Sequence, residues 1–231
     1  MPQFSLKLKQ TGPTTYIAYP TGTVHAEKIQ GDTAQFGGTT HYSEFEADGT
    51  LKMNGNATVF RDINLGGLAL GGPAASLPTE VKFLDKLGAD TGIYTYGFAI
   101  GEQVAGVLEL QHDYKEGSDI TPHVHWQGIT APGGGTDNVK WELTYTTARD
   151  GSTLSAVTVI VKESAITTQY SSNRSDFTAI TGTSFKIGDQ LIFMLKRIAA
   201  SADDYAGDAL LETFGIHYEI DTIGSRSIVT K

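Results

Sequence analysis

Alternation of apolar and polar residues is the feature of this sequence that most constrains its fold. From Val139 to Tyr145 every second residue is large and apolar, and the residues between them are charged or carry a hydroxyl group. Successive side chains of a β-strand point to opposite faces, so this pattern predicts a strand with one buried face. The same alternation recurs at residues 214–220, and residues 92–99, 104–110 and 155–161 are three further expected strands.

In three other segments the pattern of residues indicates the secondary structure less directly. Thr79 to Leu87 is the best candidate for a helix, because apolar residues would share one face of it, but the segment is short and its pattern leaves helix and strand both open. Leu191 to Leu195 is a continuous apolar run, which is typical of a strand covered on both faces. The glycine-rich segment from Gly66 to Pro73 predicts a surface loop or flexible connector. Strands at this spacing, separated by glycine-rich turns, predict an all-β sandwich or barrel.

Composition excludes several classes of function. The 231 residues include 27 glycines and only 19% charged residues, which indicates an ordered, turn-rich protein. The net charge is −9 without any basic cluster, so nucleic acid is not an expected partner. Cysteine is absent, which excludes disulfides, thiolate metal sites and cysteine nucleophiles. Neither a signal peptide nor an apolar run of roughly 20 residues is recognisable, so we expect synthesis in the cytoplasm and no membrane partner.

The first 55 residues differ from the rest. They contain short segments rich in threonine and glycine, with few large apolar side chains. Residues 47–50 are expected to form the turn of a hairpin between residues 42–46 and 51–53. A segment with so few large apolar side chains cannot form a core of its own and is expected to pack against another surface or another subunit. The sequence therefore predicts two parts, an extended N-terminal arm at residues 1–55 and a β-sandwich domain at residues 56–231.

The strongest chemical candidate is the pair His123 and His125. Gly117 and this pair resemble the opening of the cupin metal motif, but residues 126–130 lack the glutamate that should follow. His217 and Glu219 share a face of another expected strand, so three imidazoles and a carboxylate could converge to hold a metal ion.

Strand parity favours a different interpretation of these four residues. His123 and His125 alternate with apolar neighbours, as do His217 and Glu219, so both pairs are expected to face away from the core. We therefore interpret them as a polar strand face or a subunit interface, and predict no catalytic residue and no cofactor. If they line a subunit contact, protonation near pH 6 is expected to change its stability.

Two further motifs are weaker. Asp90-Thr91-Gly92 matches the aspartic-protease triplet, but the same residues form an ordinary turn, which is the interpretation preferred here. The acidic segment at residues 203–208, with Glu212 beyond it, has enough oxygen atoms for calcium but not the spacing of an EF-hand, so a solvated loop is expected. Neither a phosphate-binding loop nor a Gly-x-Ser-x-Gly elbow is present in the sequence. No enzyme signature emerges.

Three blocks of the sequence belong together: residues 56–62, residues 108–126 followed by 139–145, and residues 202–211 running into 216–226. These blocks resemble a widespread family of tailed-bacteriophage virion proteins. The resemblance covers roughly residues 56–231 and does not extend clearly to the first 55.

The resemblance implies a structural role. Such proteins look like jelly-roll capsid cement or decoration proteins, which bind the outer surface of the head as homotrimers. The implied partners are the major capsid protein and two sister chains, and the implied location is the capsid surface of the virion after synthesis in the host cytoplasm. Residues 1–55 would then spread across neighbouring capsid subunits or wrap a sister chain. Two alternatives stay open, a tail or head fibre or receptor-binding component, and a cupin-like metalloenzyme that uses His123, His125 and His217.

Overall fold

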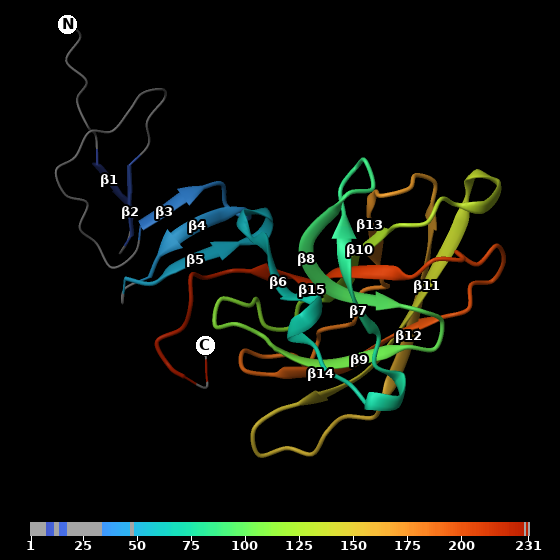
Figure 1. The fold of residues 1–231 in the computed structure, drawn as a ribbon. Coiled ribbons are helices and arrows are strands. Elements are labelled where there is room, and N and C mark those ends of the chain that lie inside the picture. Colours follow the sequence, from blue (N-terminus) through green and yellow to red (C-terminus); the bar gives the residue numbers. More distant parts are fainter. Residues whose placement is uncertain (1–7, 12–13, 18–33, 47–48, 229, 231) are drawn as a thin grey trace, which may run out of the picture.

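The computed structural model describes residues 8–11, 14–17, 34–46, 49–228 and 230, and it consists almost entirely of strands (Figure 1). None of the helices in this described part is long and apolar enough to cross a membrane. The strands are β1 (Leu8–Thr11), β2 (Thr14–Ile17), β3 (Ala34–Gly37), β4 (Tyr42–Phe45), β5 (Leu51–Asn54), β6 (Val59–Gly66), β7 (Thr79–Leu84), β8 (Asp90–Phe98), β9 (Gln103–Glu109), β10 (Ile120–Gly128), β11 (Asp137–Ala148), β12 (Thr158–Ile166), β13 (Ser172–Asp176), β14 (Gln190–Ile198) and β15 (Ala209–Ile220). Short 3-10 helices are η1 (Gly55–Ala57), η2 (Gly67–Ala69), η3 (Ala74–Ser76) and η4 (Gly133–Gly135).

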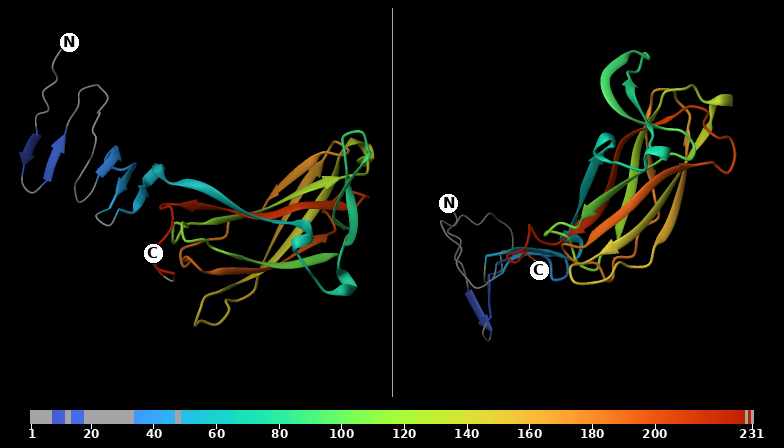
Figure 2. Two further views of the ribbon diagram at one scale, coloured as in Figure 1. Left: turned by 60° about the vertical axis from the view of Figure 1, so that its left-hand side comes forward. Right: turned by 60° about the horizontal axis from the view of Figure 1, so that its bottom comes forward.

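Two antiparallel sheets pack face to face as a sandwich (Figure 2). One has the order β13-β10-β15-β8-β7, and the other has the order β12-β11-β14-β9. The eight strands from β8 to β15 can be numbered 1 to 8 along the chain. Their spatial order is then 1-8-3-6 in one sheet and 2-7-4-5 in the other. This is the strand order of a jelly roll, so the expected all-β, jelly-roll-like sandwich is confirmed.

Strand alternation builds the core between the sheets. Trp126 and Phe214 enter it from one sheet, and Trp141 and Phe193 enter it from the other, all of them buried. The rings of Phe193 and Phe214 lie 4.1 Å apart, so side chains of the two layers are in direct contact. The indole of Trp126 donates to the Ser175 hydroxyl at 3.0 Å, which satisfies its one polar atom inside the core.

A buried arginine holds one corner of the sandwich. The guanidinium of Arg197, on β14, donates to the backbone carbonyls of Phe98 at 2.7 Å and Gly207 at 2.6 Å, and also to that of Tyr205. The Tyr205 hydroxyl in turn donates to the Thr130 carbonyl at 2.9 Å. These bonds fix the loop between β14 and β15 against the end of β8.

The N-terminal strands form two small sheets outside the sandwich (Figure 2). β1 pairs with β2, and β3, β4 and β5 form a three-stranded sheet in which β4 and β5 make the expected hairpin. The backbone N–H of Met53 donates to the Asp221 carbonyl at 2.6 Å, which ties β5 to the segment after β15. The other residues of the predicted arm, 1–7, 12–13, 18–33 and 47–48, lie outside the described residues, and the boundary after residue 55 stays a prediction.

Three local expectations are corrected. The helix considered for Thr79–Leu87 does not form, because residues 79–84 are strand β7, paired with β8, and Leu87 is 81% exposed in the following turn. The run Leu191–Leu195 is not fully covered on both faces, since β14 alternates between buried and partly buried residues. The segment Gly66–Pro73 is not a loose connector. Leu70 is buried in the core, and Gly71 pairs with Ala105 on β9.

Candidate functional site

Three adjacent strands bring a carboxylate and two imidazoles together on the outer face of the larger sheet. Asp62 lies on β6, His217 on β15 and His123 on β10. Asp62 and His217 are register partners, whereas His123 stands opposite Gly215. Neighbours of His123 and His217 along their strands, such as Val124 and Ile216, belong to the core, so the two imidazoles project from the opposite face.

The three side chains are close enough to share one ion. The Nε2 atoms of His123 and His217 lie 3.6 Å and 3.5 Å from the same oxygen of Asp62, Oδ2. The two rings are 4.3 Å apart between centroids, and one ligand atom from each of the three residues lies within 4.8 Å of the others. Within the described ranges, no other group of three histidine, aspartate or glutamate residues meets this criterion.

His123 is fully buried although it projects from the outer face. Its exposed fraction is 0%, and neither ring nitrogen has a hydrogen-bond partner among the described residues. A glycine opposite the ring makes this placement possible. A Cβ at position 215 would lie 2.9 Å from Cε1 of His123 and 2.8 Å from the carbonyl oxygen of Ile63, so Gly215 leaves the space that the ring and β6 need.

Burial sets the protonation state of His123. Desolvation lowers the pKa of His123 to about 4, and the nearby Asp62 carboxylate opposes this shift only in part. The imidazole is therefore neutral at neutral pH, with a lone pair on one ring nitrogen. The pH 6 transition considered from the sequence does not apply to His123, because this group keeps its charge state down to about pH 4.

The other two candidate residues lie near this group but make different contacts. The ring of His125 stands edge-on to that of His123, with 5.2 Å between centroids. The Glu219 carboxylate accepts from the Thr58 hydroxyl and from the Lys115 ammonium, the latter at 2.9 Å. Burial opposes ionisation of Glu219, yet these two hydrogen bonds lower its pKa. The carboxylate beside the imidazoles is therefore that of Asp62, and not that of Glu219 as the sequence suggested.

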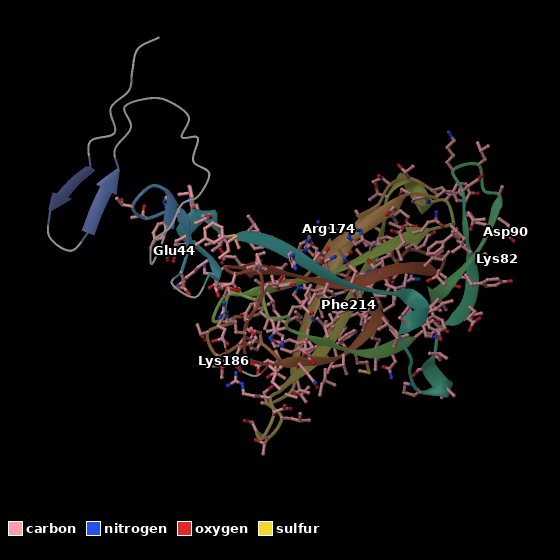
Figure 3. The ribbon with its side chains drawn as sticks, turned by 90° about the vertical axis from the view of Figure 1, so that its left-hand side faces the viewer. Glu44, Lys82, Asp90, Arg174, Lys186 and Phe214 are labelled. Atoms are coloured by element: carbon pink, nitrogen blue, oxygen red, sulfur yellow. The ribbon has the colours of Figure 1, made fainter. Side chains whose placement is uncertain are left out.

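The weaker sequence motifs have ordinary structural roles. The turn expected at Asp90-Thr91-Gly92 is wrong, because these residues begin strand β8 and the chain turns at residues 85–89 instead. The exposed Asp90 carboxylate accepts from the Lys82 ammonium at 2.7 Å and from the Gly92 N–H at 2.7 Å. Figure 3 shows the Lys82 and Asp90 pair at the opposite end of the molecule from Glu44 of the small sheet. In the acidic loop, the carbonyl of Asp203 accepts from the Asn138 N–H at 2.7 Å, so the loop continues the hydrogen bonding to β11 beyond the end of β14.

Comparison with known proteins adds little to this geometry. No protein-family model matches the chain, and no curated protein matches it. Among solved structures, the chain is similar to a carbohydrate-binding module in complex with beta-1,4-galactotriose, at 10% sequence identity and a TM-score of 0.26. The match covers 72% of this chain and 88% of that chain. A likeness of this degree carries no argument about function.

Proposed function

We propose that this chain is a cement or decoration protein of a tailed-bacteriophage capsid. It binds the outer surface of the head as a homotrimer, contacts the major capsid protein and stabilises the shell, without a catalytic role. The proposal starts from the resemblance of residues 56–231 to phage virion proteins. The jelly-roll body is compatible with it, because a rigid sandwich can carry attachment surfaces at several places, and many weak contacts on a lattice add up through effective concentration.

The observation that carries the proposal is an aromatic pair on the small sheet outside the sandwich. Phe36 on β3 and Phe45 on β4 are 54% and 46% exposed, and their rings stand edge-to-face with 6.4 Å between centroids. Large aromatic side chains gain most of their free energy by burial, and exposed apolar clusters mark interaction surfaces. This sheet therefore has the character of an attachment element that completes its burial against another subunit.

A second apolar surface lies on the body. The outward-facing residues of the four-stranded sheet include three valines on β9 and β12 that are about half exposed. On β14, next to β9, two partly buried apolar residues continue this surface, whereas the outward residues of β11, between β14 and β12, are polar, such as Glu142 and Thr144. This face provides a contact for a sister chain in the proposed trimer. Its residues are Val107, Val159, Val161, Ile192 and Met194.

The attachment element is tested by changing its two aromatic residues together. The full chain and the Phe36→Ser/Phe45→Ser variant are added to phage heads prepared without the protein, and bound copies are counted by quantitative gel analysis. The matched control is Leu87→Ser, which changes an 81% exposed residue at the other end of the body. We expect the double variant to lose most of its binding and the control to bind as the unchanged chain does. Equal decoration by all three proteins would contradict the proposed attachment element.

Copy number and mass test the rest of the proposal. Hundreds of copies spread over the head are expected from immunogold labelling of virions, whereas a few copies at the tail or at one vertex would indicate a fibre or receptor-binding component. Sedimentation equilibrium is expected to give three times the chain mass of 24.7 kDa. A monomer both in solution and on the particle would refute the homotrimer.

A further inference from the structure

We propose that Asp62, His123 and His217 bind one divalent transition-metal ion, with zinc as the expected metal, and that the ion cross-links strands β6, β15 and β10. The site is separate from the attachment surfaces of the proposed function and does not depend on them. It differs from the arrangement suggested by the sequence, since its carboxylate comes from β6 and neither His125 nor Glu219 belongs to it.

The spacing of the three groups fits the first coordination shell of zinc. Zinc binds imidazole nitrogen and carboxylate oxygen at about 2.0–2.2 Å in tetrahedral sites, so the ligand atoms of one ion lie about 3.3–3.5 Å apart. The distances from Asp62 Oδ2 to the Nε2 atoms of His123 and His217 are 3.6 Å and 3.5 Å. These two distances need side-chain shifts of only a few tenths of an ångström. The ligand atoms of the two histidines lie within 4.8 Å of each other and would close by up to about 1.3 Å, through rotation of the partly exposed His217 side chain.

The burial of His123 points to the same conclusion independently. A polar group that is buried without a hydrogen-bond partner destabilises the folded state, and such groups are uncommon in folded proteins. Nε2 of His123 is buried, has no hydrogen-bond partner among the described residues, and faces Asp62 and His217. Coordination of a cation gives this nitrogen a partner. The glycine at position 215 keeps the space beside the ring open, as a side chain there would not.

The remaining coordination position faces solvent. The side chain of Asp62 is 33% exposed and that of His217 is 27% exposed, whereas His123 closes the site from the sheet side. Three protein ligands and one water molecule would complete a tetrahedral shell. An ion can thus reach the site from outside without opening the sandwich.

The ion would fasten the strand that leads from the N-terminal sheets into the body. β6 pairs with β15 alone among the described strands, and most of its residues are exposed. Its present attachments include the ladder to β15 and the ion pair of Arg61 with Asp113. A metal ion held by Asp62 and by the two histidines on β15 and β10 would add coordination bonds between β6 and the rest of the sheet, in addition to side-chain packing.

The test uses the full chain without a polyhistidine tag, stripped with a chelator and titrated with ZnCl₂ in a calorimeter. We expect one zinc ion per chain and a rise of the melting temperature with zinc concentration. Asp62→Asn and His217→Gln are expected to weaken binding by at least about tenfold. His125→Gln is the matched control, because it removes a neighbouring imidazole from the same face, and it should bind zinc as the unchanged chain does. Co²⁺ in place of zinc should give the visible absorption of a tetrahedral site.

Hydrogen exchange then locates the effect of the ion. Zinc is expected to slow amide exchange in residues 59–66 of the unchanged chain and to leave it unaltered in Asp62→Asn. Failure of the unchanged chain to bind zinc would overturn the inference. So would unaltered binding in both Asp62→Asn and His217→Gln, which would place the ion elsewhere, or loss of binding in His125→Gln, which would show a different set of ligands.

Discussion

Removal of the buried guanidinium at position 197 is the most direct test of how the sandwich is held together. Arg197→Met keeps a long apolar side chain but leaves the carbonyls of Phe98, Tyr205 and Gly207 without their donor. Each buried carbonyl that loses its partner costs about 1–3 kcal/mol, and the charged guanidinium no longer has to be desolvated, which offsets part of this loss. We expect the free energy of unfolding to fall by about 3–5 kcal/mol, because three carbonyls lose their donor and the avoided desolvation offsets only part of that cost.

Urea unfolding, followed by tryptophan fluorescence, measures this change. Both tryptophans of the chain, Trp126 and Trp141, are fully buried in the core, so their emission reports loss of the sandwich. Lys196→Met is the matched control, because it changes the neighbouring residue of β14, which is partly exposed on the outer face. It is expected to alter stability by less than about 0.5 kcal/mol. If Arg197→Met costs less than about 1 kcal/mol, or no more than the control, the anchoring role assigned to this arginine is wrong.

Two further predictions concern alkaline pH and the glycine beside the histidine cluster. Burial raises the pKa of Tyr114 and of Tyr218 to about 12, whereas both phenols ionise near pH 10 in the unfolded chain. Stability should therefore be unaffected below pH 10 and fall between pH 10 and 12, by about 2–3 kcal/mol for each tyrosine, and Tyr218→Phe should remove about half of this slope in urea titrations. A flat profile would contradict these pKa values. Gly215→Ala would place a Cβ 2.8 Å from the Ile63 carbonyl oxygen and is expected to cost about 1–3 kcal/mol in the same assay. At Gly66 the space is open, so Gly66→Ala should be nearly neutral, and equal effects at both positions would refute the steric argument.

Local alternation made much of the sandwich predictable. Residues 139–145 and 214–220 alternate because each has one face in the core and one outside, and they form parts of β11 and β15. The pairing of these strands follows from contacts between distant residues, such as Lys140 with Ile198, which no local pattern encodes. Periodicity predicted a sandwich or barrel, and the narrower expectation of a jelly roll came from the resemblance.

The failures have a physical cause in the same long-range contacts. Val81, Leu84 and Leu87 suit a helix, but the Gln127 side chain exchanges hydrogen bonds with the backbone of Leu84 and, together with β8, holds that backbone extended. Leu191 to Leu195 is apolar throughout because Ile192 and Met194 belong to an outer face that is only partly exposed.

The alternation of side chains along the strands predicted only part of the histidine cluster. Alternation placed His123 and His217 on the face opposite the core, which is where they lie. It could not show that Asp62 would meet them, because the register of β6 against β15 pairs Asp62 with His217, which lies 155 positions later in the sequence. Nor could it show that His123 would be buried, since the space beside its ring depends on Gly215, on another strand.

The central place of β15 has a consequence for how the chain reaches its fold. β15 follows every other strand of the sandwich in the sequence, yet it lies between β10 on one side and β6 and β8 on the other. During synthesis, β6 and β10 emerge long before the strand that joins them, and until then their edges are unpaired and open to wrong partners. The larger sheet therefore closes in one late step, and a ribosome that stalls before residue 209 releases a chain that cannot complete it.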